Sequence, residues 1–76
     1  MISKDKFLNF TQADFSKQTV EELAITTLIQ DAHWAHQNYI FIDKKTFSQE
    51  TIDKVKNAGY NVVIGYGDIA RIKISW

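Results

Sequence analysis

Two histidines come nearest to a metal-binding pattern in this 76-residue chain. His33 and His36 lie three residues apart, which on a helix places them about 60° apart around the axis. Zinc sites need three or four strong ligands, and Asp31 and Gln37 do not supply a third one at a familiar spacing. The chain also has no cysteine. We therefore expect no metal and no cofactor, with one histidine in solvent and the other at the edge of the core.

The sequence shows no recognisable nucleophile and no phosphate loop. Serines and threonines are present, but none lies in a sharp strand-to-helix turn or close in sequence to a base. The segment Gly65-Tyr66-Gly67 lacks a third glycine and joins two expected strands, whereas a phosphate loop leads into a helix N-terminus. We interpret it as a turn, and we expect a protein that is not an enzyme.

Length and composition indicate a single globular domain spanning residues 1–76. The chain is 45% hydrophobic and 24% charged, as in ordinary globular proteins. No apolar run approaches the roughly 18 residues needed to cross a membrane, and the first residues lack the pattern of a signal peptide. We expect synthesis in the cytoplasm and no membrane partner.

The charges balance to zero over the whole chain but not within its halves. Residues 1–38 carry three lysines against five carboxylates, and residues 39–76 carry six basic side chains against four carboxylates. A domain that binds nucleic acid mainly through phosphates usually has a larger basic excess. The composition therefore favours a protein partner over nucleic acid.

The chain is organised around an amphipathic helix expected over 19–38. Thr19 is placed as its N-cap, Glu22 can return a hydrogen bond to the Thr19 backbone, and Asn38 is the expected left-handed residue at the end. At about 100° per residue, one apolar stripe faces the core, with His36 at its edge. The stripe contains Ala24, Ile25, Leu28, Ile29, Ala32, Ala35 and Tyr39. The side expected in solvent contains Glu22, Thr26, Gln30, His33 and Gln37.

Leu23 and Trp34 align on a second ridge of this helix, outside the main stripe. They lie eleven residues apart, about three helical turns. Two explanations of this Leu23–Trp34 ridge are open. Either the N-terminal segment folds over the ridge and covers it, or the ridge anchors a partner protein, since exposed tryptophan is costly and is enriched at binding hot spots.

Residues 1–18 form an N-terminal arm without a sustained hydrophobic period. Its aromatic side chains, Phe7, Phe10 and Phe15, are too numerous to leave in water. Thr11 or Asp14 can start a short helix within the arm. The arm either closes the domain's own core or inserts into a neighbouring subunit or partner, and the sequence does not separate these alternatives.

Downstream of the long helix, the sequence predicts a strand, a second helix and two further strands. The apolar run from Tyr39 to Ile42 is expected to be a strand covered on at least part of both faces. Ser48 is a good cap for the second helix, and Gly59 is a good left-handed residue after it. Strands over 60–64 and 69–76 are then expected to form a hairpin.

This order predicts an α+β fold, with the helix and strands of residues 19–76 as the body. The first strand, the second helix and the second strand form a crossover, which would make those two strands parallel. We therefore expect two helices on one face of a small three-stranded mixed sheet, with the aromatic arm added to it. The position of the last strand in the sheet is open.

Four cations are expected near the open face of this sheet. Arg71 and Lys73 alternate with apolar residues in the last strand, and Lys44 and Lys45 follow the first strand. Such cations can meet phosphates while an aromatic side chain stacks on a base. The sequence shows no clear aromatic pair beside them, and the alternative is a solvated sheet face.

The segment Asn57-Ala58-Gly59-Tyr60 closes the second helix, and the chain ends on Ile74-Ser75-Trp76. With these residues, the part from 48 to 76 resembles a group of small, mostly uncharacterised bacteriophage proteins. The long helix before an apolar strand is similar to their first half. The resemblance implies a compact α+β unit, associated in some cases with virion genes. It supplies no catalytic residues and no counterpart of the arm.

From these observations we expect a non-enzymatic phage protein that acts through protein-protein contacts. The leading hypothesis is a minor virion component, made in the host cytoplasm, that uses the aromatic arm and the Leu23–Trp34 ridge to bind virion subunits, including other copies of itself. The alternative is a small early protein that binds and inhibits a host factor. A third hypothesis is a weak nucleic-acid-binding module.

Overall fold

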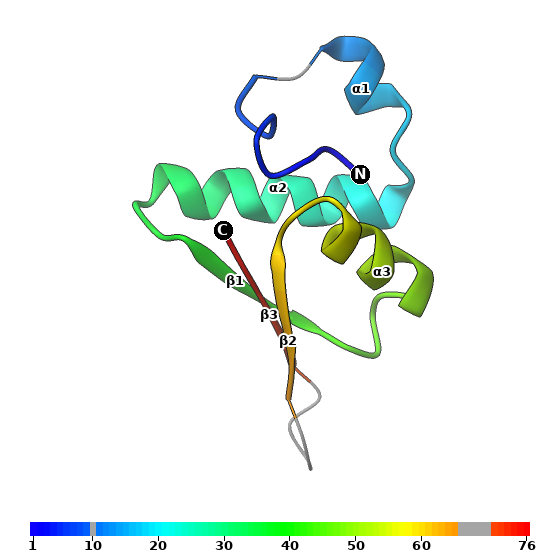
Figure 1. Ribbon diagram of the computed structural model, residues 1–76, viewed down its shortest axis with the longest axis vertical. Coiled ribbons are helices and arrows are strands. Elements are labelled where there is room, and N and C mark those ends of the chain that lie inside the picture. Colours follow the sequence, from blue (N-terminus) through cyan, green and yellow to red (C-terminus); the bar gives the residue numbers. More distant parts are fainter. Residues whose placement is uncertain (10, 66–70) are drawn as a thin grey trace.

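The computed structural model describes residues 1–9, 11–65 and 71–76. These described residues form three helices and three strands, which confirms the expected α+β class (Figure 1). They are α1 (Gln12–Ser16), α2 (Val20–Trp34), β1 (Tyr39–Asp43), α3 (Gln49–Asn57), β2 (Asn61–Ile64) and β3 (Arg71–Ser75). Phe10, the centre of the expected turn (residues 66–68) and the first two residues of the expected third strand (residues 69 and 70) lie outside the described residues.

The sheet has β3 in its middle, paired antiparallel with β1 on one side and β2 on the other. The strands β1 and β2 therefore run in the same direction, as expected, but they do not pair with each other, and the sheet is antiparallel rather than mixed. In this order Ile74 lies opposite both Ile40 and Val62. The central strand thus places its isoleucines against apolar residues on both sides, and antiparallel ladders are slightly more stable per residue than a parallel one.

Strand alternation separates a buried face from an exposed face. One face carries the isoleucines of β1 and β3 into the core, and α2 packs over β1 while α3 packs over β2. The least exposed side chains of this core are Ile25 and Ile29 from α2, Val55 from α3, and Ile72 and Ile74 from β3. Both helices therefore cover the same face, and the other face of the sheet is open.

The helix α2 ends at Trp34, four residues earlier than expected. His36, with φ of 63°, takes the left-handed conformation that we expected for Asn38. The His36 N–H donates to the His33 carbonyl (3.0 Å), and the Gln37 N–H donates to the Ala32 carbonyl (2.9 Å). These two bonds form a Schellman motif, which stops the helix and releases Tyr39 into β1.

The long helix is covered on the side that we expected to be in solvent. Glu22 is 3% exposed and Thr26 is 1% exposed, whereas Ala24, Leu28 and Ala35 of the expected apolar stripe are exposed. The arm runs along the side of α2 that faces away from the sheet (Figure 1). Helical periodicity could not reveal this because polar side chains become buried when a neighbouring segment satisfies their hydrogen bonds.

Two glutamines join the arm to this side of α2 through hydrogen bonds. Gln18 accepts a hydrogen bond from the Thr26 hydroxyl (2.9 Å) and one from the Ile2 N–H (3.4 Å) through the same oxygen. Gln30 donates from its side-chain nitrogen to the Phe7 carbonyl (3.1 Å). The polar side of α2 is therefore an attachment surface for the arm.

The carboxylate of Glu22 on α2 forms ion pairs with the arm and with α3. It lies 2.7 Å from the Met1 ammonium and 3.1 Å from the Lys54 ammonium. The expected bond from this side chain to the Thr19 backbone is absent, although Thr19 caps α2 by accepting from the Glu22 N–H (3.2 Å). Burial opposes ionisation of Glu22, but its hydrogen bonds from Met1 and Lys54 outweigh burial and hold its pKa below the usual value.

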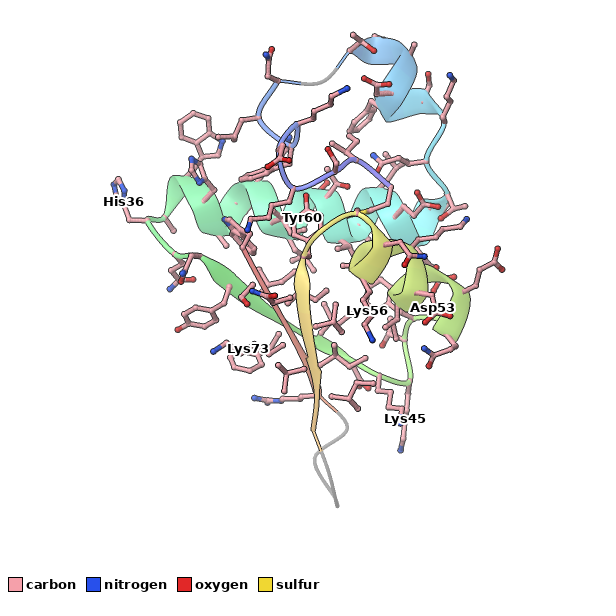
Figure 2. All side chains as sticks on the ribbon, viewed as in Figure 1. His36, Lys45, Asp53, Lys56, Tyr60 and Lys73 are labelled. Atoms are coloured by element: carbon pink, nitrogen blue, oxygen red, sulfur yellow. The ribbon has the colours of Figure 1, made fainter. Side chains whose placement is uncertain are left out.

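Tyr60 fixes the arm from the other side. Its hydroxyl donates to the Ile2 carbonyl (3.2 Å), and the Lys4 N–H donates to the Ala58 carbonyl (2.9 Å). The Tyr60 side chain, labelled in Figure 2, is 3% exposed. Burial, together with the negative charge of Asp5, raises the pKa of Tyr60 to about 12.

We predict that the free energy of unfolding depends on Glu22 ionisation. Because the folded-state pKa lies below 4.5, the stabilisation is complete above about pH 5 and is lost as the pH falls through the folded-state value. Glu22→Gln should cost about 2 kcal/mol at pH 7, since it removes the carboxylate that accepts charge-assisted hydrogen bonds from the Met1 and Lys54 ammonium groups. Urea unfolding between pH 3 and pH 7 measures both effects. The difference in the free energy of unfolding between the wild-type protein and Glu22→Gln should shrink at low pH. A difference that stays constant with pH would contradict the prediction.

We predict that His36→Gly stabilises the protein. A left-handed conformation costs an L-residue about 1–2 kcal/mol, and glycine avoids this cost. Part of the gain is lost because glycine has a higher conformational entropy in the unfolded state. Since His36 is exposed, no packing is lost, and the free energy of unfolding should rise by about 0.5–1 kcal/mol. The control His36→Ala keeps a β-carbon and should show no such rise in the same urea titration.

Candidate functional site

The end of α2 presents the most exposed aromatic side chain among the described residues. Trp34 is 74% exposed, and its indole ring meets the His33 imidazole edge-on at 5.9 Å between centroids. Leu23, the other member of the Leu23–Trp34 ridge, is half-buried, and Val20 beside it is 83% exposed. The arm covers the neighbouring side of the helix and leaves Trp34 in solvent.

The aromatic side chains of the arm do not form a common exposed surface. Phe7 is 7% exposed and packs edge-on against His33 (5.4 Å) and Trp76 (5.9 Å). Phe15, on α1, is half-buried, and Phe10 lies outside the described residues. Phe7 therefore closes the domain's own core, and it is not available as an anchor for a partner in this conformation.

The two histidines have exchanged the environments that we expected. His33 is half-buried against Phe7, whereas His36 is exposed at the end of α2, where Figure 2 shows it pointing away from the body. Among residues 1–9, 11–65 and 71–76, no group of three histidine, cysteine or acidic side chains could hold a metal ion. The structure thus gives no ligand set for the histidine pair.

A cavity of about 310 Å³ lies within the arm. Its lining comes from the first residues of the chain and the region of α1, namely Met1, Ile2, Ser3, Lys6, Asp14, Lys17 and Gln18. The charged members Lys6, Asp14 and Lys17 are exposed. Backbone and side-chain hydrogen bonds from Thr11 hold the pKa of Asp14 below its usual value, in the capping box that begins α1. This cavity therefore offers a solvent-facing charged rim and no buried acid or base.

The outer face of the sheet carries a second group of exposed apolar side chains. Phe41 is 54% exposed, Val63 is 60% exposed and Tyr39 is 37% exposed. The register places Phe41, Lys73 and Val63 side by side in one row across the three strands. We call the set of Tyr39, Phe41, Val63, Arg71 and Lys73 the outer sheet surface.

Within the outer sheet surface, two aromatic rings and one cation are in direct contact. The Tyr39 and Phe41 rings meet edge-on, 5.6 Å apart, and the Lys73 ammonium lies 5.1 Å from the centre of the Tyr39 ring. Arg71 lies opposite Asp43 in the next row. The two cations expected on the open face are therefore exposed there, as predicted, and Lys44 and Lys45 are exposed in the segment after β1.

Sequence reasoning missed the aromatic pair beside these cations. The helical pattern places Tyr39 in the apolar stripe, and the run from Tyr39 to Ile42 predicts a strand buried on part of both faces. The signal was present, because aromatic and isoleucine residues alternate in β1 and the isoleucines are the buried set. An alternation of two residue types that are both apolar is easily mistaken for a continuous buried run.

The chain matches no family model, no curated protein and no solved structure. Within the part of the chain that the structure describes, no helix is both long enough and apolar enough to cross a membrane. The candidate surfaces therefore rest on the geometry of the domain itself.

We predict that Phe7 and Trp34 differ sharply in their effect on stability. Phe7→Ala removes a buried ring and should lower the free energy of unfolding by about 3–5 kcal/mol. Trp34→Ala removes an exposed ring and should change it by no more than about 0.5 kcal/mol. Urea unfolding of both variants checks the contrast. A large loss for Trp34→Ala would show that this residue belongs to the core.

Proposed function

We propose that this protein is a non-enzymatic phage protein that acts by binding another protein, as a minor component of the virion, with Trp34 as its principal anchor. The observation that carries the proposal is the 74% exposure of Trp34 at the end of α2. Tryptophan is strongly enriched among residues that contribute about 2 kcal/mol or more at interfaces. The second tryptophan, Trp76, packs against Phe7 instead.

The residues that resemble phage proteins have structural roles in this domain. Gly59, with φ of 98°, follows the end of α3 in a conformation that L-residues rarely adopt, and Tyr60 is buried beneath the arm. Ile74 is 1% exposed in the central strand. The resemblance therefore supports the phage origin that we propose. The assignment of Trp34 as an anchor rests on its exposure alone.

The proposal is tested by quantitative mass spectrometry of purified particles from the source phage. A fixed copy number relative to the major capsid protein is the expected result. In a phage carrying Trp34→Ala, the copy number should fall at least tenfold while the protein accumulates normally in infected cells. Leu28→Ala, at a 41% exposed position of the same helix, is the matched control and should leave incorporation unchanged.

The alternative is a small early protein that uses the same anchor to bind a host factor. Absence from particles together with abundance in infected cells would reject the virion role and favour this alternative. A photo-reactive amino acid at Asp31, an exposed position about one turn before Trp34 on α2, would then identify the host protein, whose binding to the purified domain should be lost on Trp34→Ala.

A further inference from the structure

The outer sheet surface is an exposed feature that the proposed function does not use. Three of its members are large apolar side chains, yet a cation stands in the middle of them. In the central row, Lys73 lies between Phe41 on β1 and Val63 on β2. A partner for this face must cover aromatic rings and at the same time provide negative charge.

Charge is divided between the two layers of the domain, although the whole chain is neutral. The sheet side, from the strands and the segment after β1, carries four exposed cations and one described carboxylate, Asp43. The arm and the helices carry five lysines and seven carboxylates, and Asp68 lies outside the described residues. The open face is therefore basic while the opposite side is acidic, a difference that net charge conceals.

From this arrangement we propose that the outer sheet surface binds single-stranded nucleic acid, with bases stacked on Phe41 and Tyr39 and phosphates bound by Lys73 and Arg71. The two aromatic residues lie two positions apart on one strand, about 6.6 Å, so that successive bases of an extended strand can meet successive rings. The exposed lysines after β1, Lys44 and Lys45, extend the path for the phosphate backbone.

The position of Lys73 decides between nucleic acid and an apolar protein surface. Covering this face with a protein would bury the Lys73 ammonium, and lysine is depleted from the centres of protein interfaces for that reason. A single strand instead brings phosphates to the edge of each stacked base. The Lys73 ammonium now lies over the Tyr39 ring, and a base that stacks there would release it towards a neighbouring phosphate.

The experiment is a fluorescence-anisotropy titration of the whole chain with fluorescein-labelled ten-nucleotide oligouridine and oligothymidine. With three phosphates neutralised, affinity should fall about 20-fold between 50 and 200 mM salt. Phe41→Thr keeps a residue suited to a strand and should weaken binding at least fivefold through lost stacking. Lys73→Gln should weaken binding and lower the salt dependence by about one phosphate contact.

Two controls separate this site from the rest of the molecule. Lys56→Gln removes an exposed lysine of α3, away from the outer sheet surface (Figure 2), and should leave affinity unchanged. Trp34→Ala should also leave it unchanged, so the result is independent of the proposed protein partner. When the oligonucleotide is added, the amide chemical shifts of isotope-labelled protein should change in β1 and β3. Circular dichroism checks that each variant folds.

Three results would overturn the proposal. The first is no binding at 50 mM salt. The second is equal affinity for a duplex of the same length, with Phe41→Thr and Tyr39→Thr both without effect, which would indicate diffuse attraction between charges. The third is self-association of the protein that is abolished by Phe41→Thr, without oligonucleotide binding, which would make this face an interface between copies of the chain.

Discussion

The buried carboxylate of Glu22 joins three separate parts of the chain. It lies on α2 and contacts both the Met1 ammonium at the start of the arm and Lys54 on α3. A carboxylate at 3% exposure is costly unless it is paired, so the arm and α3 must be in place for α2 to hold this residue. The same attachment brings Phe7 into the core. Because the arm is fixed along one side of α2, Trp34 lies beyond its coverage and the helix end stays open.

Local signals predicted the elements well. Thr19 and Ser48 cap α2 and α3, and Gly59 takes a positive φ where a helix terminator was expected. These features depend on backbone groups within one turn, which the neighbouring residues determine. The covered side of α2 and the central place of β3 were not predictable in this way. Both depend on contacts between segments far apart in the sequence, and helical periodicity carries no information about which segment covers a polar face.

Some features of the candidate surfaces can likewise be predicted from neighbouring residues, whereas others depend on contacts between segments far apart in the sequence. Helical spacing identifies the Leu23–Trp34 ridge, but it leaves open whether the arm covers this ridge, and in the structure Leu23 is half-buried while Trp34 is exposed. Whether Phe7 faced a partner or the core depended on the path of the arm. The aromatic pair on β1 became recognisable only when the register set Phe41 beside Lys73. Net charge concealed the basic face because charge on one layer compensates for charge on the other.

The central strand of the sheet comes last in the sequence. Because β1 and β2 do not pair with each other, every ladder hydrogen bond in this sheet involves β3. A chain that has formed only its first two strands has no sheet at all, and its apolar isoleucines lack a partner strand. Closing the sheet then requires β3 to enter between two elements already joined by α3, a non-local step of the kind that slows folding. Neither ladder of the sheet can therefore form until the last strand of the chain is in place.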